Sequence, residues 1–136
     1  MKPTESELEI LHILWEKGPA TVRIVNDLLN ERRKSGLSAP RGKESAGYTT
    51  TLKLMQIMYE KGLVTREEDG RTHLYAAAVR KNDTQSLLLQ QFVDNTFRGS
   101  TARLVMQALG NHEASAEELD EIKALIAQIE QNQSKP

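Results

Sequence analysis

The sequence predicts a mainly α-helical fold with one small β-hairpin, and three observations lead to this prediction. Apolar residues recur with helical spacing in the centre of the chain and in several segments on either side of it. Gly62 then marks the end of the central helix. Residues 63–66 and 73–76 alternate as strands do, and residues 67–71 between them form a turn that contains an Asp-Gly pair. A helix followed directly by a hairpin with a charged tip is typical of the winged helix-turn-helix fold.

Two helices are expected before the central one. Thr4 and Glu7 have the spacing of a capping box, which predicts the start of the first helix, and Gly18-Pro19 predicts its end. Residues 20–22 fit either a short edge strand or a lead into the second helix, which is expected over residues 23–33. The residues that these two helices are expected to bury include Leu8, Leu11, Trp15, Val25, Leu28 and Leu29.

The central helix has two chemically different faces when residues are placed 100° apart around its axis. One arc carries Thr51, Leu52, Met55, Met58 and Tyr59. The opposite arc carries Thr49, Thr50, Lys53 and Glu60. Hydroxyl and ammonium groups suit phosphates and base edges, so the polar arc is a candidate DNA-reading surface. An ordinary core helix packed on a hairpin would show the same periodicity, and that alternative stays open at this point.

The charges of the chain are distributed unevenly, although the net charge is only −1. Residues 1–81 hold 14 Lys and Arg against 11 Asp and Glu, whereas residues 82–136 hold 4 against 8. Basic residues gather between positions 32 and 53, a distribution that favours a polyanionic partner. Residues 34–47 are rich in Gly, Ser and Pro and predict a long loop that carries Arg41 and Lys43. This loop fits a solvated connection and a phosphate-binding loop equally well.

Three short apolar helices are expected in residues 82–136. The first ends at Arg98-Gly99, the second ends at Gly110-Asn111, and the third starts with a capping box at Ser115 and Glu118. None of them can close a core alone, which favours helices that interlock with a second copy of the chain. Packing back onto their own domain is the alternative. The expected dimer contacts are Leu88, Phe92, Leu104, Val105, Ile122 and Ile126.

The sequence offers no pattern for catalysis or for a bound cofactor. It contains no cysteine, and His12, His73 and His112 lie far apart without ligand-spaced partners, so no metal site is expected. Neither a phosphate-binding glycine loop nor a Ser/His/Asp arrangement is present. An enzyme is therefore not expected. No apolar run approaches the ~20 residues of a membrane span and no signal peptide is recognisable, which indicates a cytoplasmic protein.

Three segments together resemble the penicillinase-repressor family of bacterial transcription regulators (BlaI/MecI type). They are LEILHILWEKGPATVRIVNDLL (8–29), GYTTTLKLMQIMYEKGLV (47–64) and GRTHLY (70–75). The resemblance implies an N-terminal winged-helix domain, a helical dimerisation tail and repression at operators with dyad symmetry. It also implies that Thr49, Thr50 and Lys53 face the major groove and that Arg71 sits at the wing.

The chain departs from the family at three places. Gln56-Ile57 stand where the family often has a basic pair, and the cysteine pairs of copper-responsive relatives are absent. In the family, a membrane sensor-protease pathway leads to cleavage of the repressor in its tail. The matching position here is Gln107-Ala108, which replaces the family's Asn-Phe pair.

These observations predict a homodimeric, sequence-specific DNA-binding repressor without cofactors. Its winged-helix DNA-binding domain is expected over residues 1–81 and its helical dimerisation region over residues 82–136. Thr49, Thr50 and Lys53 are expected to contact base edges or phosphates of a palindromic operator, and Arg41, Lys43 and Arg71 the DNA backbone. The alternative is a winged-helix protein-protein interaction module that does not bind DNA specifically.

Overall fold

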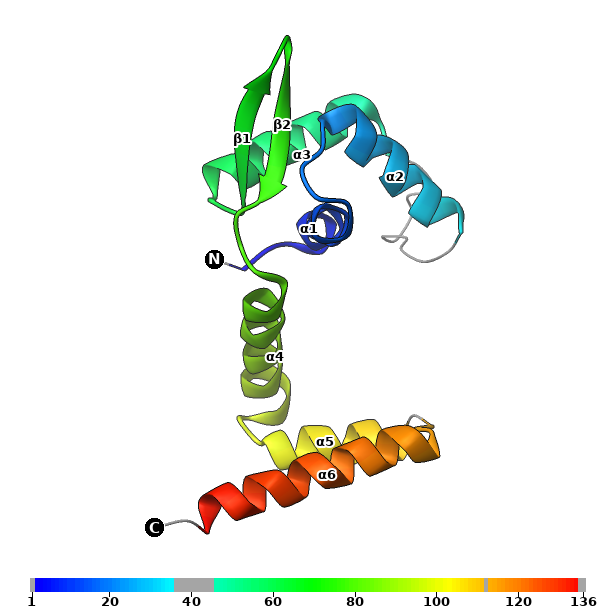
Figure 1. The fold of residues 1–136 in the computed structure, drawn as a ribbon, viewed down its shortest axis with the longest axis vertical. Coiled ribbons are helices and arrows are strands. Elements are labelled where there is room, and N and C mark those ends of the chain that lie inside the picture. The colour runs from blue at the N-terminus through cyan, green and yellow to red at the C-terminus, as the bar shows by residue number, and fades with distance from the viewer. Residues whose placement is uncertain (1, 36–45, 112, 135–136) are drawn as a thin grey trace. The chain divides into compact units, whose positions relative to one another are not determined.

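The computed structural model describes residues 2–35, 46–111 and 113–134. Its elements in chain order are α1 (Glu5–Lys17), α2 (Val22–Lys34), α3 (Tyr48–Glu60), β1 (Val64–Asp69), β2 (Thr72–Ala77), α4 (Lys81–Phe97), α5 (Thr101–Asn111) and α6 (Ala116–Gln133) (Figure 1). The predicted fold class is confirmed, because helices dominate and β1 and β2 form a two-stranded antiparallel sheet. Arg41, Lys43 and His112 lie outside the described residues, so what was expected of them stays a prediction.

The chain divides into two compact units, residues 1–89 and residues 90–136. Helix α4 contributes residues to both units. The first unit contains α1, α2, α3 and the hairpin, and the second contains α5 and α6. The division expected between residues 81 and 82 separates two functions, DNA binding and dimerisation, and it stays a prediction.

Helix α1 begins and ends where the sequence predicts. The Thr4 backbone N–H donates to Glu7 Oε1 at 2.8 Å, and the Glu7 backbone N–H donates to Thr4 Oγ1 at 3.2 Å. This reciprocal capping satisfies N–H groups that have no partner inside the helix. The helix ends at Lys17, and the next residue, Gly18, adopts a positive φ of 89°.

Residues 20–22 take both of the roles that the sequence left open. The Ala20 backbone pairs with Tyr75 of β2 through two hydrogen bonds of 2.9 and 2.8 Å, so this residue extends the sheet by one bridge. Thr21 then caps α2, because its side chain accepts a hydrogen bond of 3.3 Å from the Ile24 backbone N–H. The chain therefore passes from the sheet edge into α2 without a longer linker.

The hairpin is longer and its turn is tighter than expected. Val64 lies opposite Ala77 and Asp69 lies opposite Thr72, which leaves only Gly70 and Arg71 in the turn. Gly70 has a φ of 66°, and glycine at the first position of a two-residue turn is the pattern of a type II′ hairpin. The expected turn over residues 67–71 is therefore wrong, because strand pairing continues through three acidic residues of β1.

The core of the first unit lies where α1, α2, α3 and the hairpin meet. It consists of Ile10, Leu11, Ile13, Leu14, Ala20, Val22, Val25, Leu29, Met55, Met58, Leu63, Val64 and Tyr75. Trp15 packs against this core and donates a hydrogen bond of 2.9 Å from its indole nitrogen to the Val79 carbonyl oxygen. Leu8 and Leu28, which were expected inside, are only half-buried.

The helices of the second unit also end and start at the predicted residues. Arg98 and Gly99 have φ values of 51° and 82°, which ends α4. Ser115 and Glu118 form the predicted capping box of α6. Among the described residues of this unit, Val93 is the one buried apolar side chain. Within the described ranges, no helix is both long and apolar enough to cross a membrane.

Candidate nucleic-acid interface

Helix α3 separates its side chains into the two faces that the sequence predicts, with one exception. Thr51, Met55 and Met58 are buried, and the side chains of Thr49 and Lys53 are exposed. The complete exposed set on α3 is Tyr48, Thr49, Thr50, Lys53, Gln56, Ile57, Tyr59 and Glu60. Tyr59 was expected on the apolar arc, but it is exposed and packs against the hairpin instead. The three predicted DNA-reading residues therefore lie together on one solvent-facing helix.

Polar contacts from α2 fix the start of α3. The Thr51 hydroxyl donates a hydrogen bond of 2.7 Å to Asn26 Oδ1. The Asn30 side chain makes two hydrogen bonds to the backbone of Ala46, which precedes α3, at 3.2 and 2.6 Å. Asn26 and Asn30 are four residues apart and so share one face of α2. Because buried polar groups are costly to leave unpaired, these contacts define the rotation and the position of α3.

An ion pair from α1 fixes the end of α3. Lys61 Nζ lies 2.6 Å from Glu7 Oε1, and the Glu7 side chain is buried. Burial alone would raise the pKa of Glu7, but its hydrogen bond and charge interaction with Lys61 and its hydrogen bonds with Thr4 outweigh this effect. The pKa of Glu7 is therefore lowered from its ordinary value of 4.5. Glu7 thus serves both as the capping residue of α1 and as the anchor of Lys61.

The basic residues at the end of α2 are less available than the sequence indicates. Arg33 Nη2 lies 3.0 Å from Glu9 Oε1, and both side chains are almost fully buried, at 5% and 6% exposure. Arg32 forms an ion pair with Glu16, in which Nη1 lies 3.7 Å from Oε2. A buried, paired guanidinium cannot neutralise a phosphate, so Arg33 does not belong to the predicted basic surface. It joins α2 to α1 instead.

The hairpin that follows α3 is the wing of the fold, and its charges are mixed. Arg71 lies exposed at the tip, but the adjoining β1 carries Glu67, Glu68 and Asp69, which are also exposed. The Arg66 guanidinium lies over the Tyr59 ring at 4.0 Å from its centre, a cation–π contact between the wing and α3. Arg71 therefore offers a cation at the tip of the wing beside three carboxylates, while Arg66 holds the wing against α3.

The first turn of α3 has a second arginine–tyrosine contact and no side-chain cap. Arg23 of α2 lies over the Tyr48 ring at 5.8 Å. Gly47 occupies the N-cap position and provides no side-chain hydrogen bond. The backbone N–H groups of this first turn, next to Thr49 and Thr50, therefore keep their capacity to donate to an anion.

The residues expected at the dimer contact lie on α4, α5 and α6. Phe92, Val105 and Ile126 are exposed in the single chain, whereas Leu88, Leu104 and Ile122 are half-buried. Gln107 and Ala108, the expected cleavage position, are exposed residues within α5. Their role stays a prediction from the family resemblance.

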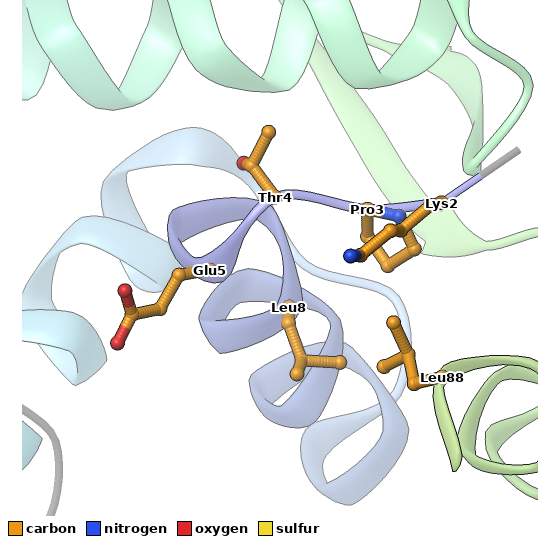
Figure 2. A pocket seen from close by; sticks show the side chains of 6 residues that line it. All are labelled: Lys2, Pro3, Thr4, Glu5, Leu8 and Leu88. Carbon is orange, nitrogen blue, oxygen red and sulfur yellow. The ribbon is translucent and has the colours of Figure 1, made fainter. Parts of the chain in front are cut away.

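A hollow of about 530 Å³ lies beside the N-terminal segment and includes Leu88, one of the residues expected at the dimer contact. It is lined by Lys2, Pro3, Thr4, Glu5, Leu8 and Leu88. Figure 2 shows the Leu8 and Leu88 side chains on one side of it, below the N-terminal segment. Of the predicted DNA-contacting residues that the structure describes, Thr49, Thr50, Lys53 and Arg71, none lines this hollow.

The residues that position α3 were not recognised from the sequence. Asn26, Asn30 and Lys61 each make a contact that becomes visible only when α3 is placed against α1 and α2. The spacing of the two asparagines, four residues apart on one face of an otherwise apolar–charged helix, was the available signal. Glu7 was recognised as a capping residue, but its second role was not.

Comparisons of sequence and structure identify the known proteins that this chain resembles. The sequence profile of the Penicillinase repressor family matches residues 3–128. The methicillin resistance regulatory protein MecI of Staphylococcus aureus (strain N315) is 21% identical over 123 residues, which cover 90% of this chain and 91% of MecI. The penicillinase repressor of Bacillus licheniformis is 20% identical over 123 residues, with 90% and 88% covered. A crystal structure of a "probable transcriptional regulator" from Pseudomonas aeruginosa aligns at 19% identity with a TM-score of 0.42, covering 95% of this chain and 78% of that chain.

Proposed function

The chain belongs to the penicillinase repressor family, and on this premise we propose that it acts as a homodimer on a palindromic DNA operator. Members of a repressor family are transcriptional regulators, so the protein is a DNA-binding regulator and not an enzyme. A repressor of bacterial genes works where the chromosome is, so the proposal places the protein in the cytoplasm.

The observation that carries the proposal is the exposed face of α3. Thr49, Thr50 and Lys53 lie together on this face, and contacts from α1 and α2 fix both ends of the helix. A helix of this size fits the major groove of B-DNA, where hydroxyls and an ammonium group can donate to base edges and phosphates. A rigidly held helix loses little freedom on binding, which favours affinity.

The charges of the wing suggest how the DNA contacts are divided between the wing and α3. Arg71 can reach a phosphate, but the three carboxylates of β1 would repel the same backbone. We therefore expect α3 to provide most of the affinity and the wing to provide a smaller part. Arg41 and Lys43 are proposed to add backbone contacts beside α3.

The homodimer is supported by the apolar surface of the tail. Phe92 is 49% exposed and Ile126 is 50% exposed, and further large apolar side chains on α5 and α6 are exposed as well. Large apolar side chains exposed in this number on a single chain are typical of an interface with a partner. A second copy would bury them and would bring two α3 helices to half-sites about one DNA turn apart, about 34 Å.

Measuring DNA binding as a function of salt tests the proposal. Fragments are first selected from random-sequence DNA with the full-length protein, and the affinity for the best fragment is then measured between low and high salt. Affinity should fall linearly on a log–log plot, with a slope of about −0.9 per phosphate contacted. Lys53→Ala should weaken binding by about 1–3 kcal/mol and relax preference at one base pair.

Two further variants separate base reading from general attraction. Arg71→Ala should weaken binding to all DNA sequences by a similar factor, and this factor should be smaller than the effect of Lys53→Ala. Lys123→Ala removes an exposed lysine of α6 and should leave affinity unchanged. If no fragment is enriched, or if binding does not depend on salt, the protein is not a DNA-binding repressor of this kind, and a protein-interaction module becomes the better interpretation.

A further inference from the structure

Two adjacent residues on the exposed face of α3, Gln56 and Ile57, have no role in the contacts described above. Both side chains are exposed, and Ile57 keeps 39% of its surface accessible although it is a large apolar residue. Within the described residues, the Gln56 amide makes no hydrogen bond. An uncharged amide and a branched apolar group therefore stand free side by side on the predicted reading surface.

Their position relative to the other reading residues follows from helix geometry. Ile57 lies four residues after Lys53 and seven after Thr50, and Gln56 lies seven after Thr49, so all five share one face of α3. Gln56 and Ile57 are about 100° apart around the axis at almost the same height. They thus lie on either side of the middle of this face, about one helical turn beyond Lys53.

The turn that carries Ile57 is held rigidly. The Lys61 backbone N–H donates to the Ile57 carbonyl oxygen at 2.9 Å, and the Lys61 ammonium group is anchored by Glu7. Met55 and Met58, on either side of the pair in the sequence, are fully buried. The two side chains are therefore presented at a fixed height and angle, as residues that read sequence must be.

The major groove offers one base pair whose features match this combination. Adenine presents N7 and N6–H₂, which the amide of Gln can bind with two hydrogen bonds, and thymine presents the C5 methyl group, the apolar feature of the groove. We propose that Gln56 and Ile57 read A·T pairs in each half-site, Gln56 through the adenine edge and Ile57 through a thymine methyl. This assignment rests on the proposed function and adds two specificity-determining residues to it.

Replacing single thymines by deoxyuridine tests the methyl contact directly, because deoxyuridine lacks only the C5 methyl group. The probe is the duplex that the full-length protein enriches from random-sequence DNA, with each thymine replaced in turn. The wild-type protein should lose roughly three- to fivefold in affinity at one thymine per half-site, the effect of one buried methyl group. Ile57→Ala should bind the two duplexes equally well at that position.

The matched control is Ile24→Ala, because Ile24 is also 39% exposed but lies on α2. This variant should keep the full preference for thymine over deoxyuridine. For Gln56, replacing adenines one at a time by 7-deazaadenine removes the N7 acceptor, and Gln56→Ala should abolish the sensitivity at one position. Thermal unfolding of each variant, together with Ile57→Val, which keeps most of the side chain, checks that lost discrimination is not lost folding.

The outcomes separate this inference from the proposed function. If the protein selects a specific duplex but the Ile57→Ala variant retains the wild-type penalty for deoxyuridine at every position, Ile57 does not read a thymine methyl and the inference is overturned. If no duplex is enriched at all, the DNA-binding function itself fails. Loss of the thymine preference in Ile57→Ala alone, with Ile24→Ala unchanged, supports the assignment.

Discussion

The two units of the chain differ in how far their apolar side chains are buried. In residues 1–89, apolar side chains from three helices and the hairpin form a buried core, with Ile10, Leu11 and Met55 at 0% exposure. In residues 90–136, Val93 is the buried apolar residue among those described, and leucines and isoleucines of α6 lie exposed. The first unit thus has a core within the single chain, whereas most large apolar side chains lie exposed among the described residues of the second unit. The proposed dimer would account for this difference, because a second copy would bury the apolar side chains that the second unit leaves exposed.

The largest expected effect comes from placing a charge in the apolar surface of the tail. Phe92→Asp or Leu104→Asp would bury an unpaired carboxylate in the proposed dimer interface, so the dimer should weaken by at least about 4 kcal/mol, roughly a thousandfold in Kd. Sedimentation should show a monomer whose first unit remains folded. Asn95→Asp, at an exposed polar position of α4, should remain dimeric. A Phe92→Asp protein that stays dimeric would place the interface elsewhere.

Truncating one leucine in each unit makes the comparison quantitative. Leu11→Ala opens a cavity in a complete core and should lower the free energy of unfolding by about 3 kcal/mol at any protein concentration. Leu125→Ala removes a side chain that is 56% exposed in the single chain, so its cost should depend on how much dimer is present. Urea unfolding at two protein concentrations distinguishes the two behaviours. Equal, concentration-independent losses for both variants would mean that the second unit has an internal core after all.

The smallest of the three effects concerns acid stability of the first unit. Since the pKa of Glu7 is lowered in the folded protein, its pairing stabilises the fold above pH 4.5 and is lost as the pH falls through the folded pKa. Lys61→Met should therefore lower the free energy of unfolding by about 2 kcal/mol near pH 7. The difference in stability between the wild type and this variant should narrow as the pH is lowered below 4.5.

Urea unfolding across this pH range measures the difference. Lys17→Met removes an exposed lysine at the end of α1 and should show no such narrowing. A wild-type advantage over Lys61→Met that is the same at both ends of the range would show that the ion pair does not depend on the ionisation of Glu7.

Much of the architecture could be predicted because it depends on local signals. The capping boxes at Thr4 and Ser115 and the helix end at Gly62 act through neighbouring residues, so the sequence locates the helix boundaries closely. The two faces of α3 follow from periodicity for the same reason. The length of the hairpin could not be predicted in this way, because Glu67–Asp69 are poor strand residues and pair only since Gly70 and Arg71 make a two-residue turn.

The remaining features of the candidate interface depend on contacts between distant residues. Arg33 belongs to a basic run in the sequence, but Glu9, 24 positions earlier, takes it into a buried pair. Tyr59 has the periodicity of a core residue, yet Arg66 covers its ring at the surface. In both cases the side chain's partner lies on another element, so charge and periodicity alone could not reveal which residues stay available for DNA.

The single tryptophan of the chain gives the first unit an optical signal of its own. Trp15 donates a hydrogen bond to the carbonyl of Val79, which lies just ahead of α4, and the centre of its ring is 5.3 Å from that of His12 in an edge-on arrangement. Both contacts lie inside the winged helix. The fluorescence of Trp15 therefore reports the state of the first unit, whereas far-ultraviolet circular dichroism records the helices of both units. Recording the two signals on one sample would show whether the tail melts together with the winged helix or before it, without any label on the protein.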